Sequence, residues 1–242
     1  MSLAMKPSSN GEIAPLRLAA TVLLVRDGAH GVQVFMVTRH RKIEFASGAL
    51  VFPGGGVDPG DRALAGDDVE RISRVAAVRE TYEECGVLLA RRRDGGALAA
   101  ASASLFYERV NAENLELSLD ALTLFAHWIT PPILPKRFDT RFYIVDAPAD
   151  QTAVHDGGEA VDSIWIEPRR ALEEAARGRY ALVLPTRLNL ELLGQSETAA
   201  QAIAAATSRR VAPIEPIAEK TANGYRLTIP ADAGYGGPHF DV

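Results

Sequence analysis

The sequence lacks the cysteines that a disulfide requires, because Cys85 is the only cysteine among its 242 residues. Disulfide-stabilised proteins fold in oxidising compartments, so a chain without a cysteine pair is typical of a reducing one. The apolar fraction of 47% is ordinary for a globular protein. We therefore expect a cytoplasmic protein that depends on a packed apolar core.

Basic residues are also fewer than acidic residues. Lysine and arginine number 26 against 31 aspartates and glutamates, which gives a formal charge of -5. General attraction to nucleic acid needs a basic face or stripe, so no nucleic-acid partner is expected. An anionic substrate must instead be bound locally, by metal ions or by a few placed cations.

Long hydrophobic runs are absent as well. The apolar run 19–25 stops at Arg26 and Asp27, far short of the roughly 18 residues that a membrane span needs. Residues 1–14 lack the apolar centre of a signal peptide. We expect these residues to form a flexible leader, residues 15–242 to form one domain, and the protein to have no membrane partner.

The first third of the sequence predicts paired strands, a glycine-rich turn and a helix. Glycines within 27–31 predict a turn between the first two strands, and the third strand stops at 53–56, which we interpret as a turn. Apolar residues at helical spacing then predict a helix over 68–89, with Gly86 at its end. The expected strands are 18–26, 32–38 and 49–52.

The rest of the sequence predicts an insertion followed by more strands and helices. The alanine- and leucine-rich stretch 95–124 predicts a helical insertion, with helices near 97–110 and 120–124. Asn223-Gly224 predicts a hairpin turn in a C-terminal extension that packs on the same domain. The further expected strands are 125–130, 140–145, 160–166, 214–218 and 225–229, and the further helices are 168–177 and 188–193.

Three glutamates, Glu80, Glu83 and Glu84, lie close together in the helix predicted over 68–89. Offsets of three and four residues place side chains on one face of a helix. Carboxylates this close repel one another unless cations neutralise them, and hard divalent ions such as Mg²⁺ and Mn²⁺ prefer oxygen ligands. The pattern therefore predicts a metal site, with Arg79 orienting or screening one carboxylate.

A solvated acidic helix face is the ordinary explanation of neighbouring glutamates, because charged side chains are mostly exposed. The preceding glycine-rich segment 53–56 favours a metal site instead, since it follows a strand and leads toward the helix. Glycine lets backbone atoms approach an ion or a phosphate closely. Gly55 and Gly56 are therefore candidate substrate-binding positions.

Segments 52–61 and 76–87 together resemble the two halves of a Nudix box. The pattern of that family is a glycine, five residues, a glutamate, seven residues, Arg-Glu, an apolar residue, any residue, Glu-Glu, any residue, Gly and an apolar residue. Here Asp61 stands at the first glutamate position, seventeen residues separate it from Arg79, and Thr81 stands at an apolar position. The ten extra residues precede the helix, where added loop length costs little, but they leave the role of Asp61 open.

The resemblance implies an α/β fold, namely an α/β/α sandwich with a mixed sheet and a helical insertion. It also implies hydrolysis of a diphosphate by a water molecule that bound ions position and acidify. By resemblance, Glu80, Glu83 and Glu84 bind the ions or activate water. The Gly54 carbonyl is a further candidate metal ligand, and Glu83 and Arg79 are the candidate catalytic residues within the box.

Members of the family often recruit one more acid from outside the box. Glu159, just before the strand predicted over 160–166, is our candidate for this catalytic position. Asp162 and Asp156 are alternatives. An ordinary loop acid is an equal explanation for Glu159, because loops are generally polar.

Residues 17–195 resemble, more specifically, the peroxisomal coenzyme A diphosphatase branch and its bacterial relatives. The segment 37–55 is similar to the stretch upstream of the box in members that cleave coenzyme A. Arg39 begins a run of four cations that could meet the extra phosphate of coenzyme A, although a solvated charge run is an equal explanation. Arg137 is a second candidate substrate-binding residue, with a structural ion pair as its alternative.

Four other residues are expected to be structural. Trp128 and Trp165 are more often core or edge aromatics than platforms for a base. His127 and His155 lack the partner spacing of a metal site, so we expect them to be structural or exposed.

These patterns together predict a magnesium- or manganese-dependent diphosphatase that acts on a small nucleotide-type substrate. Coenzyme A or acyl-coenzyme A is the candidate, and ADP-ribose, NADH or dinucleotide polyphosphates are alternatives. The competing class is a non-catalytic Nudix-fold ligand sensor, which the complete set of three glutamates disfavours. Whether two copies form a homodimer stays open.

Overall fold

The computed structural model describes residues 12–39, 48–96, 98, 105–155, 157 and 160–242. Most of the expected leader lies outside the described residues. The same holds for Glu159, for Asp156, and for the cations that follow Arg39. Among the described helices, none is both long and apolar enough to cross a membrane.

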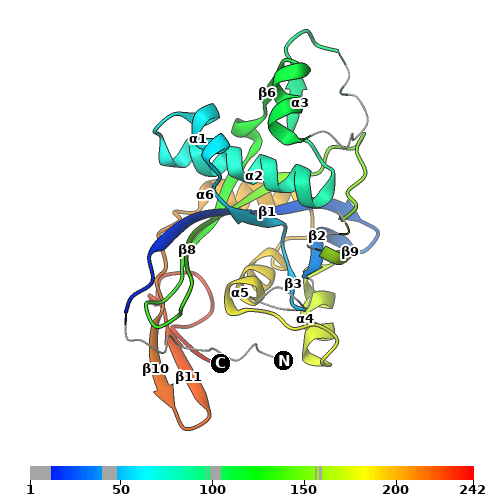
Figure 1. Cartoon of the computed structure of the whole chain (residues 1–242). Helices are drawn as coiled ribbons and strands as arrows, with labels where there is room; N and C mark the ends of the chain where they lie inside the picture. Colours follow the sequence, from blue (N-terminus) through cyan, green and yellow to red (C-terminus); the bar gives the residue numbers. More distant parts are fainter. Residues whose placement is uncertain (1–11, 40–47, 97, 99–104, 156, 158–159) are drawn as a thin grey trace.

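A mixed sheet of seven strands forms the centre of the molecule (Figure 1). Its longest strand, β1 (Leu16–Gly28), pairs in parallel with β8 (Arg137–Asp146) over ten residues. The other edge of β1 pairs antiparallel with β4 (Gly54–Gly56) near its start and with β2 (Gly31–Arg39) near its end. The outer strands are β3 (Leu50–Val51) and β9 (Ala160–Ile166), both on β2, and β7 (Thr123–Ile129) on β8.

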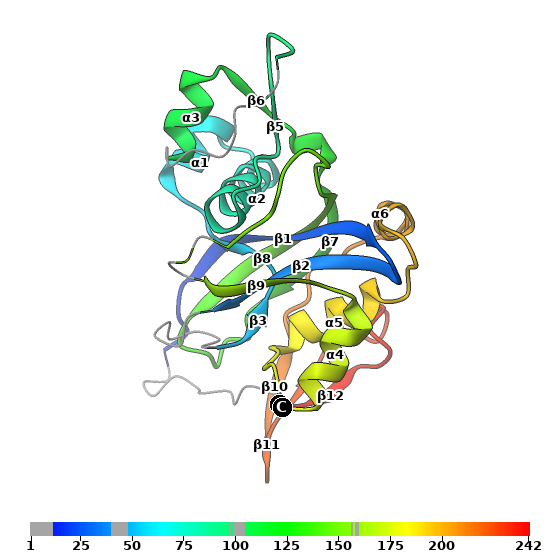
Figure 2. The same ribbon diagram turned by 90° about the vertical axis from the view of Figure 1, so that its right-hand side faces the viewer.

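Helices cover both faces of this sheet, which Figure 2 shows nearly edge-on. Side chains alternate between the faces of a strand, so along β1 the buried Val22 and Leu24 belong to one apolar cluster and Leu23 and Val25 to the other. The predicted α/β/α sandwich is therefore confirmed. The first face carries α2 (Val69–Cys85) and α3 (Phe106–Ala112), and the second carries α4 (Pro168–Ala176), α5 (Leu184–Leu193) and α6 (Ala199–Ser208).

Helix α2 is the helix predicted within 68–89, and both of its ends are marked by the sequence. Asp68 caps its start, because the carboxylate accepts a hydrogen bond from the Arg71 amide at 2.9 Å. Gly86 ends it in the left-handed conformation, with φ 70°, as the sequence predicted. The helix therefore stops at Cys85, so the predicted end of the helix at Gly86 is confirmed.

The predicted helical insertion over 95–124 is only partly helical. Apart from α3, its described part contains the strand β6 (Leu115–Leu117) and one 3₁₀ turn, η1 (Leu119–Ala121). Strand β6 pairs with β5 (Ala90–Arg92), which lies just before the insertion. Alanine content is a weak prior that tertiary contacts override. Here Arg74 of α2 donates to the Leu119 carbonyl at 2.8 Å and also to that of Leu122, which favours a turn over the predicted helix 120–124.

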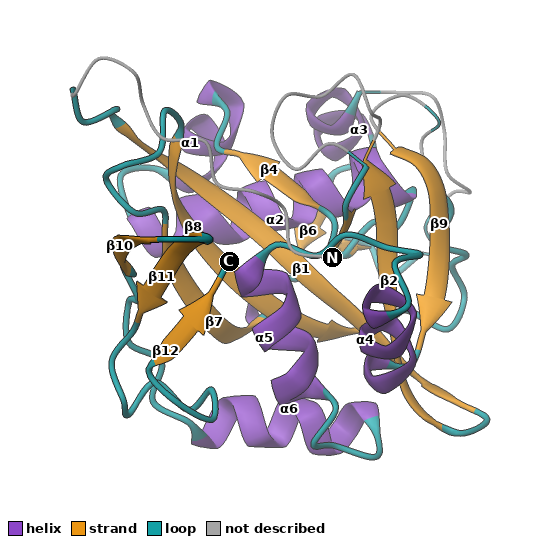
Figure 3. Cartoon of the chain, turned by 90° about the horizontal axis from the view of Figure 1, so that it is seen from below, coloured by secondary structure: helices purple, strands orange, loops and turns teal. Residues whose placement is uncertain are grey.

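The C-terminal extension forms a small sheet of three strands, two of which lie near the predicted strands 214–218 and 225–229, while the third was not predicted. Strand β11 (Gly224–Thr228) lies between β10 (Ile217–Thr221) and β12 (His239–Asp241). The turn joining the first two strands lies at 222–223, one residue earlier than predicted. Figure 3 shows this sheet beside α5, where Arg187 stacks on the Phe240 ring at 5.6 Å.

Candidate metal and catalytic site

The three glutamates project from the C-terminal half of α2, where this helix crosses β1 and β4. Their exposure differs, and this difference separates their roles. The Glu83 side chain is 42% exposed, that of Glu80 is 13% exposed, and Glu84 is buried. Glu83 is therefore the member of the set most open to water.

The glycine segment before the helix is a strand, so its interpretation as a turn was wrong. Residues 54–56 form β4, which pairs with residues 19–21 of β1. A Cβ atom at Gly54 would lie 2.4 Å from the Ala20 carbonyl oxygen, and φ is 155°, so only glycine fits there. The Gly54 amide donates to the Glu84 carboxylate at 2.8 Å. The role predicted for Gly54 involved its carbonyl, and it stays a prediction.

Gly55 lets β4 approach a metal-ligand candidate. A Cβ atom at this position would lie 2.5 Å from Glu80 Oε1. At Gly56, in contrast, a Cβ atom would have no neighbour within 4 Å. The two adjacent glycines therefore offer a matched pair for testing how closely β4 must approach Glu80.

Replacing Gly55 with alanine is expected to weaken magnesium affinity about 10- to 100-fold, the usual cost of disturbing a group that orients a metal ligand. The added methyl group displaces the end of a flexible carboxylate, so the fold is retained. Magnesium titration of the hydrolytic rate measures the effect. Gly56→Ala is the control for magnesium affinity, and equal affinities in the two variants would contradict the steric explanation.

Arg79 connects the glutamates to the glycine strand. Its Nη1 donates to Glu80 Oε1 at 2.8 Å and to Glu83 Oε2 at 2.7 Å, while Nη2 donates to the Gly56 carbonyl at 2.7 Å. The Nε atom donates to Asp61 Oδ1 at 3.0 Å. With a side chain only 4% exposed, Arg79 is held in place from four directions.

Asp61, whose role the sequence left open, is the buried partner of Arg79. Its side chain is fully buried and also accepts hydrogen bonds from the Asp58 amide at 2.8 Å and the Tyr107 hydroxyl at 2.9 Å. Part of the extra length in the box forms the short helix α1 (Pro59–Ala65), which carries Asp61. The inserted residues therefore leave the contact with Arg79 intact.

Tyr107 is a residue of this site that the sequence did not reveal. It lies on α3, in the insertion, and its ring packs so closely over Gly60 that a Cβ atom there would lie 2.4 Å away. No motif marks this tyrosine, since its contact with Asp61 depends on how the insertion packs on α1. Helical spacing within 97–110 was the only signal in that region.

The surroundings of Arg79 and Tyr107 raise the pKa of both groups and so keep both protonated. Burial alone would lower the pKa of Arg79, but hydrogen bonds and the charges of Asp61 and Glu80 raise it well above its ordinary value. Burial, followed by the hydrogen bond to Asp61, raises the pKa of Tyr107. Because the pKa of Arg79 is raised in the folded state, its ion pairs stabilise the fold at every pH below the ordinary arginine pKa. This contribution to stability is lost only at higher pH.

Among the residues that the structure describes, no three His, Cys, Asp or Glu side chains converge on a point that could hold a metal ion. The contacts of Arg79 with Glu80 and Glu83, and of Glu84 with β4, account for this arrangement. The donor set still fits Mg²⁺ or Mn²⁺, because three carboxylates on one helix face supply the preferred oxygen ligands. Side-chain rotation at the exposed Glu83 would bring it away from Arg79.

Thr81, which departs from the apolar pattern of the box, is accommodated by a hydrogen bond within the helix. Its side chain is fully buried, and its hydroxyl donates to the Ala77 carbonyl at 2.8 Å. Because its polar group is satisfied within α2, the threonine can occupy an apolar position.

The candidate substrate-binding and catalytic residues outside the box have other surroundings than the glutamates of α2. Arg137 donates to the Thr130 carbonyl at 3.0 Å and forms an ion pair with Glu215, contacts that support the structural alternative. Its role in substrate binding stays a prediction. Arg39 ends β2, but its side chain lies outside the described residues, and Asp162 is exposed on β9.

The tryptophans and histidines have structural contacts. Trp128 is buried in the core, and Trp165 packs edge-on against Phe35 and beneath Arg26. His127 Nε2 lies 2.5 Å from Asp139, and His155 Nδ1 lies 2.9 Å from the Ser163 hydroxyl. These contacts agree with the structural roles predicted for all four residues.

Comparison with known proteins decides the family. A family model described as the NUDIX domain matches residues 15–186, which is more than half of the chain. The chain belongs to the Nudix family. The crystal structure of a NUDIX hydrolase from Alicyclobacillus acidocaldarius is similar, with 29% identity and a TM-score of 0.72, and the match covers 79% of this chain and 96% of that one.

A curated Nudix relative leads to the same family. The Caenorhabditis elegans protein named "Putative nudix hydrolase 7" is 33% identical over 189 residues, which is 74% of this chain. The chain spans 61% of the length of that relative. The Nudix match ends within α5, so α6 and the small sheet β10 to β12 lie beyond it.

Proposed function

We propose that this Nudix hydrolase is a magnesium- or manganese-dependent diphosphatase that acts on a small nucleotide-type molecule. The observation that supports the proposal most directly is the cluster of Glu80, Glu83 and Glu84 on one face of α2, with Arg79 bonded to two of them. A protein that only bound a ligand would not need this complete set of carboxylates.

Each of these residues has a distinct part in the proposed reaction. Glu80, Glu83 and Glu84 would hold the ions, which polarise phosphoryl oxygens and lower the pKa of water when bound. Glu83, the most exposed of the three, accepts the proton of the attacking water. Arg79 fixes the orientation of Glu80 and Glu83, while the side-chain-free Gly55 and Gly56 leave the backbone open to a phosphate.

The bonds in this reaction balance without another reactant. The water oxygen bonds to one phosphorus, and the bond from that phosphorus to the bridging oxygen breaks. One proton passes to Glu83 and later to solvent. The products of cleaving a diphosphate diester are two phosphate monoesters.

Coenzyme A or acyl-coenzyme A is the substrate that we propose within this class. The support is the resemblance of residues 37–55 to the segment upstream of the box in members that cleave coenzyme A. In the proposal, Arg39 binds the extra phosphate of coenzyme A, and Glu159 is the further acid from outside the box. Arg39 is the last residue of β2.

The experiment is a hydrolysis screen with magnesium or manganese. The substrates are coenzyme A, acyl-coenzyme A, ADP-ribose, NADH and diadenosine polyphosphates, with products separated by chromatography and EDTA added as the metal-free control. We expect metal-dependent cleavage, with coenzyme A cleaved most efficiently. Faster cleavage of another substrate would overturn the coenzyme A assignment alone, and no turnover of any substrate would favour a ligand sensor.

A further inference from the structure

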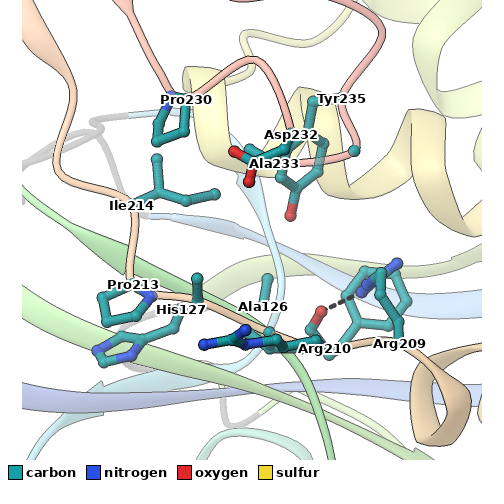
Figure 4. Close-up of a pocket in the computed structure, with 14 residues that line it drawn as sticks. Ala126, His127, Arg209, Arg210, Pro213, Ile214, Pro230, Asp232, Ala233 and Tyr235 are labelled. Atoms are coloured by element: carbon teal, nitrogen blue, oxygen red, sulfur yellow. Dashed lines mark hydrogen bonds between the residues drawn. The ribbon is translucent and has the colours of Figure 1, made fainter.

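A pocket of about 390 Å³ lies between β7 and the C-terminal part of the chain (Figure 4). The segment 209–214 lies beside β7 and is joined to it at Ile214, whose main chain hydrogen-bonds to His127 and Ile129 at 2.9 and 2.8 Å. The segment 230–235 forms the opposite wall. Both segments lie beyond the Nudix match, so the pocket is built largely by the C-terminal extension.

Two consecutive arginines line this pocket. In Figure 4, the guanidinium of Arg210 lies beside His127 and Arg209 lies below Tyr235, both on the wall of the pocket across from Asp232. Arg209 donates to the Phe125 carbonyl, and its guanidinium lies 5.0 Å from the centre of the Phe125 ring. Within the described part of the chain, neither arginine forms an ion pair with a carboxylate.

This absence is unusual for Arg209, because its side chain is partly buried. Burial lowers the pKa of its guanidinium, and no nearby carboxylate among the described residues opposes that effect. Removing a charge from water without an opposite charge is costly. An anion bound between the two arginines would supply the opposite charge that Arg209 lacks, and the exposed side chain of Arg210 is free to turn toward it.

The remaining walls restrict what else such an anion would carry. Asp232 faces the arginines across the pocket in Figure 4, where its carboxylate can accept hydrogen bonds from ligand hydroxyl groups. Pro213, Ile214 and Pro230 add an apolar wall beside it. His127 already has a hydrogen-bond partner in Asp139, so it lines the pocket but is not required to bind the anion.

We propose that this pocket binds a small phosphate monoester of nucleotide size, with Arg209 and Arg210 holding the phosphate and Asp232 accepting from a hydroxyl group. Guanidinium groups match phosphate oxygens with paired hydrogen bonds. Ligand pockets of proteins range from about 300 to 1,000 Å³, which includes this one. The site requires no residue of the carboxylate helix α2, so it does not depend on the proposed function.

Binding of AMP to the full chain by isothermal titration calorimetry tests the site. EDTA is included to prevent AMP from binding at the proposed metal site, because without divalent ions the carboxylates of α2 repel phosphate. We expect saturable binding of one AMP per chain and no binding of adenosine, which lacks the phosphate. Arg210→Gln should weaken AMP binding about tenfold or more, as the loss of a charged hydrogen bond does.

Arg210 is the informative position, because it is exposed and its replacement leaves the fold intact. Arg209→Gln is the second variant, read beside its unfolding midpoint because this side chain also contacts β7. The matched control is Arg169→Gln, an exposed arginine on α4 that should bind AMP like the wild type. Absence of saturable AMP binding, equal binding of adenosine, or unchanged affinity in Arg210→Gln would overturn the proposal.

Discussion

Replacing Glu83 with glutamine is expected to lower metal-dependent hydrolysis by about 100-fold or more while leaving the fold unchanged. A bound metal ion contributes several kcal/mol of transition-state stabilisation, and each 1.4 kcal/mol changes the rate about tenfold. Glutamine keeps the size of the side chain but removes the charge that holds the ion and accepts a proton. Because Glu83 is 42% exposed, the change leaves no buried group without a partner.

The chain contains a closely matched control for this variant. Glu191 on α5 is also 42% exposed and also pairs with an arginine four residues earlier, Arg187, at 3.2 Å. Glu191→Gln should therefore show the small effect on stability of removing an exposed carboxylate charge, and it should have no effect on turnover. Steady-state rates and urea unfolding of both variants separate the two effects, and wild-type turnover in Glu83→Gln would refute the metal-site assignment.

Replacing Arg79 with methionine is expected to lower the free energy of unfolding by about 3 to 5 kcal/mol, the usual cost of removing one partner of a buried ion pair. Asp61 would keep its charge in a fully buried position without the guanidinium that neutralises it. Hydrolysis should fall as well, since Glu80 and Glu83 lose a shared donor. Urea denaturation and kinetic measurements on the same preparations report both effects.

A second substitution separates stability from activity in this network. Asp61→Asn in the Arg79→Met background removes the buried charge, so part of the lost stability should return. Activity should stay low in the double variant, because the arginine that orients the glutamates is still missing. Strictly additive destabilisation by the two substitutions would show that Asp61 and Arg79 do not interact energetically.

The elements around the glutamates could be predicted because their signals are local. Periodicity and a terminal glycine determine where α2 ends, and apolar alternation predicts strands such as β1 and β2. The grouping of Glu80, Glu83 and Glu84 follows from helix geometry alone. The same helix geometry places Arg79 beside them.

The contacts that support the glutamates could not be predicted, because they join distant segments. Asp61 reaches Arg79 across eighteen positions, and Tyr107 reaches Asp61 across forty-six. The glycines of β4 indicate a turn when considered alone, and become a strand only when β1 supplies hydrogen-bond partners. Likewise, the strand β6 and the turn η1 in the insertion depend on pairing with β5 and on hydrogen bonds from Arg74, which the composition of the insertion does not reveal.

The parallel pairing of β1 with β8 also sets the order in which the chain can fold during synthesis. Leu16 pairs with Arg137, so the main partner of the central strand leaves the ribosome about 120 residues after it. At about 5 to 20 residues per second, this delay is roughly 6 to 24 seconds. Until β8 arrives, the hairpin of β1 and β2 exposes an unpaired apolar edge that favours aggregation, so slower translation should increase its dependence on chaperones.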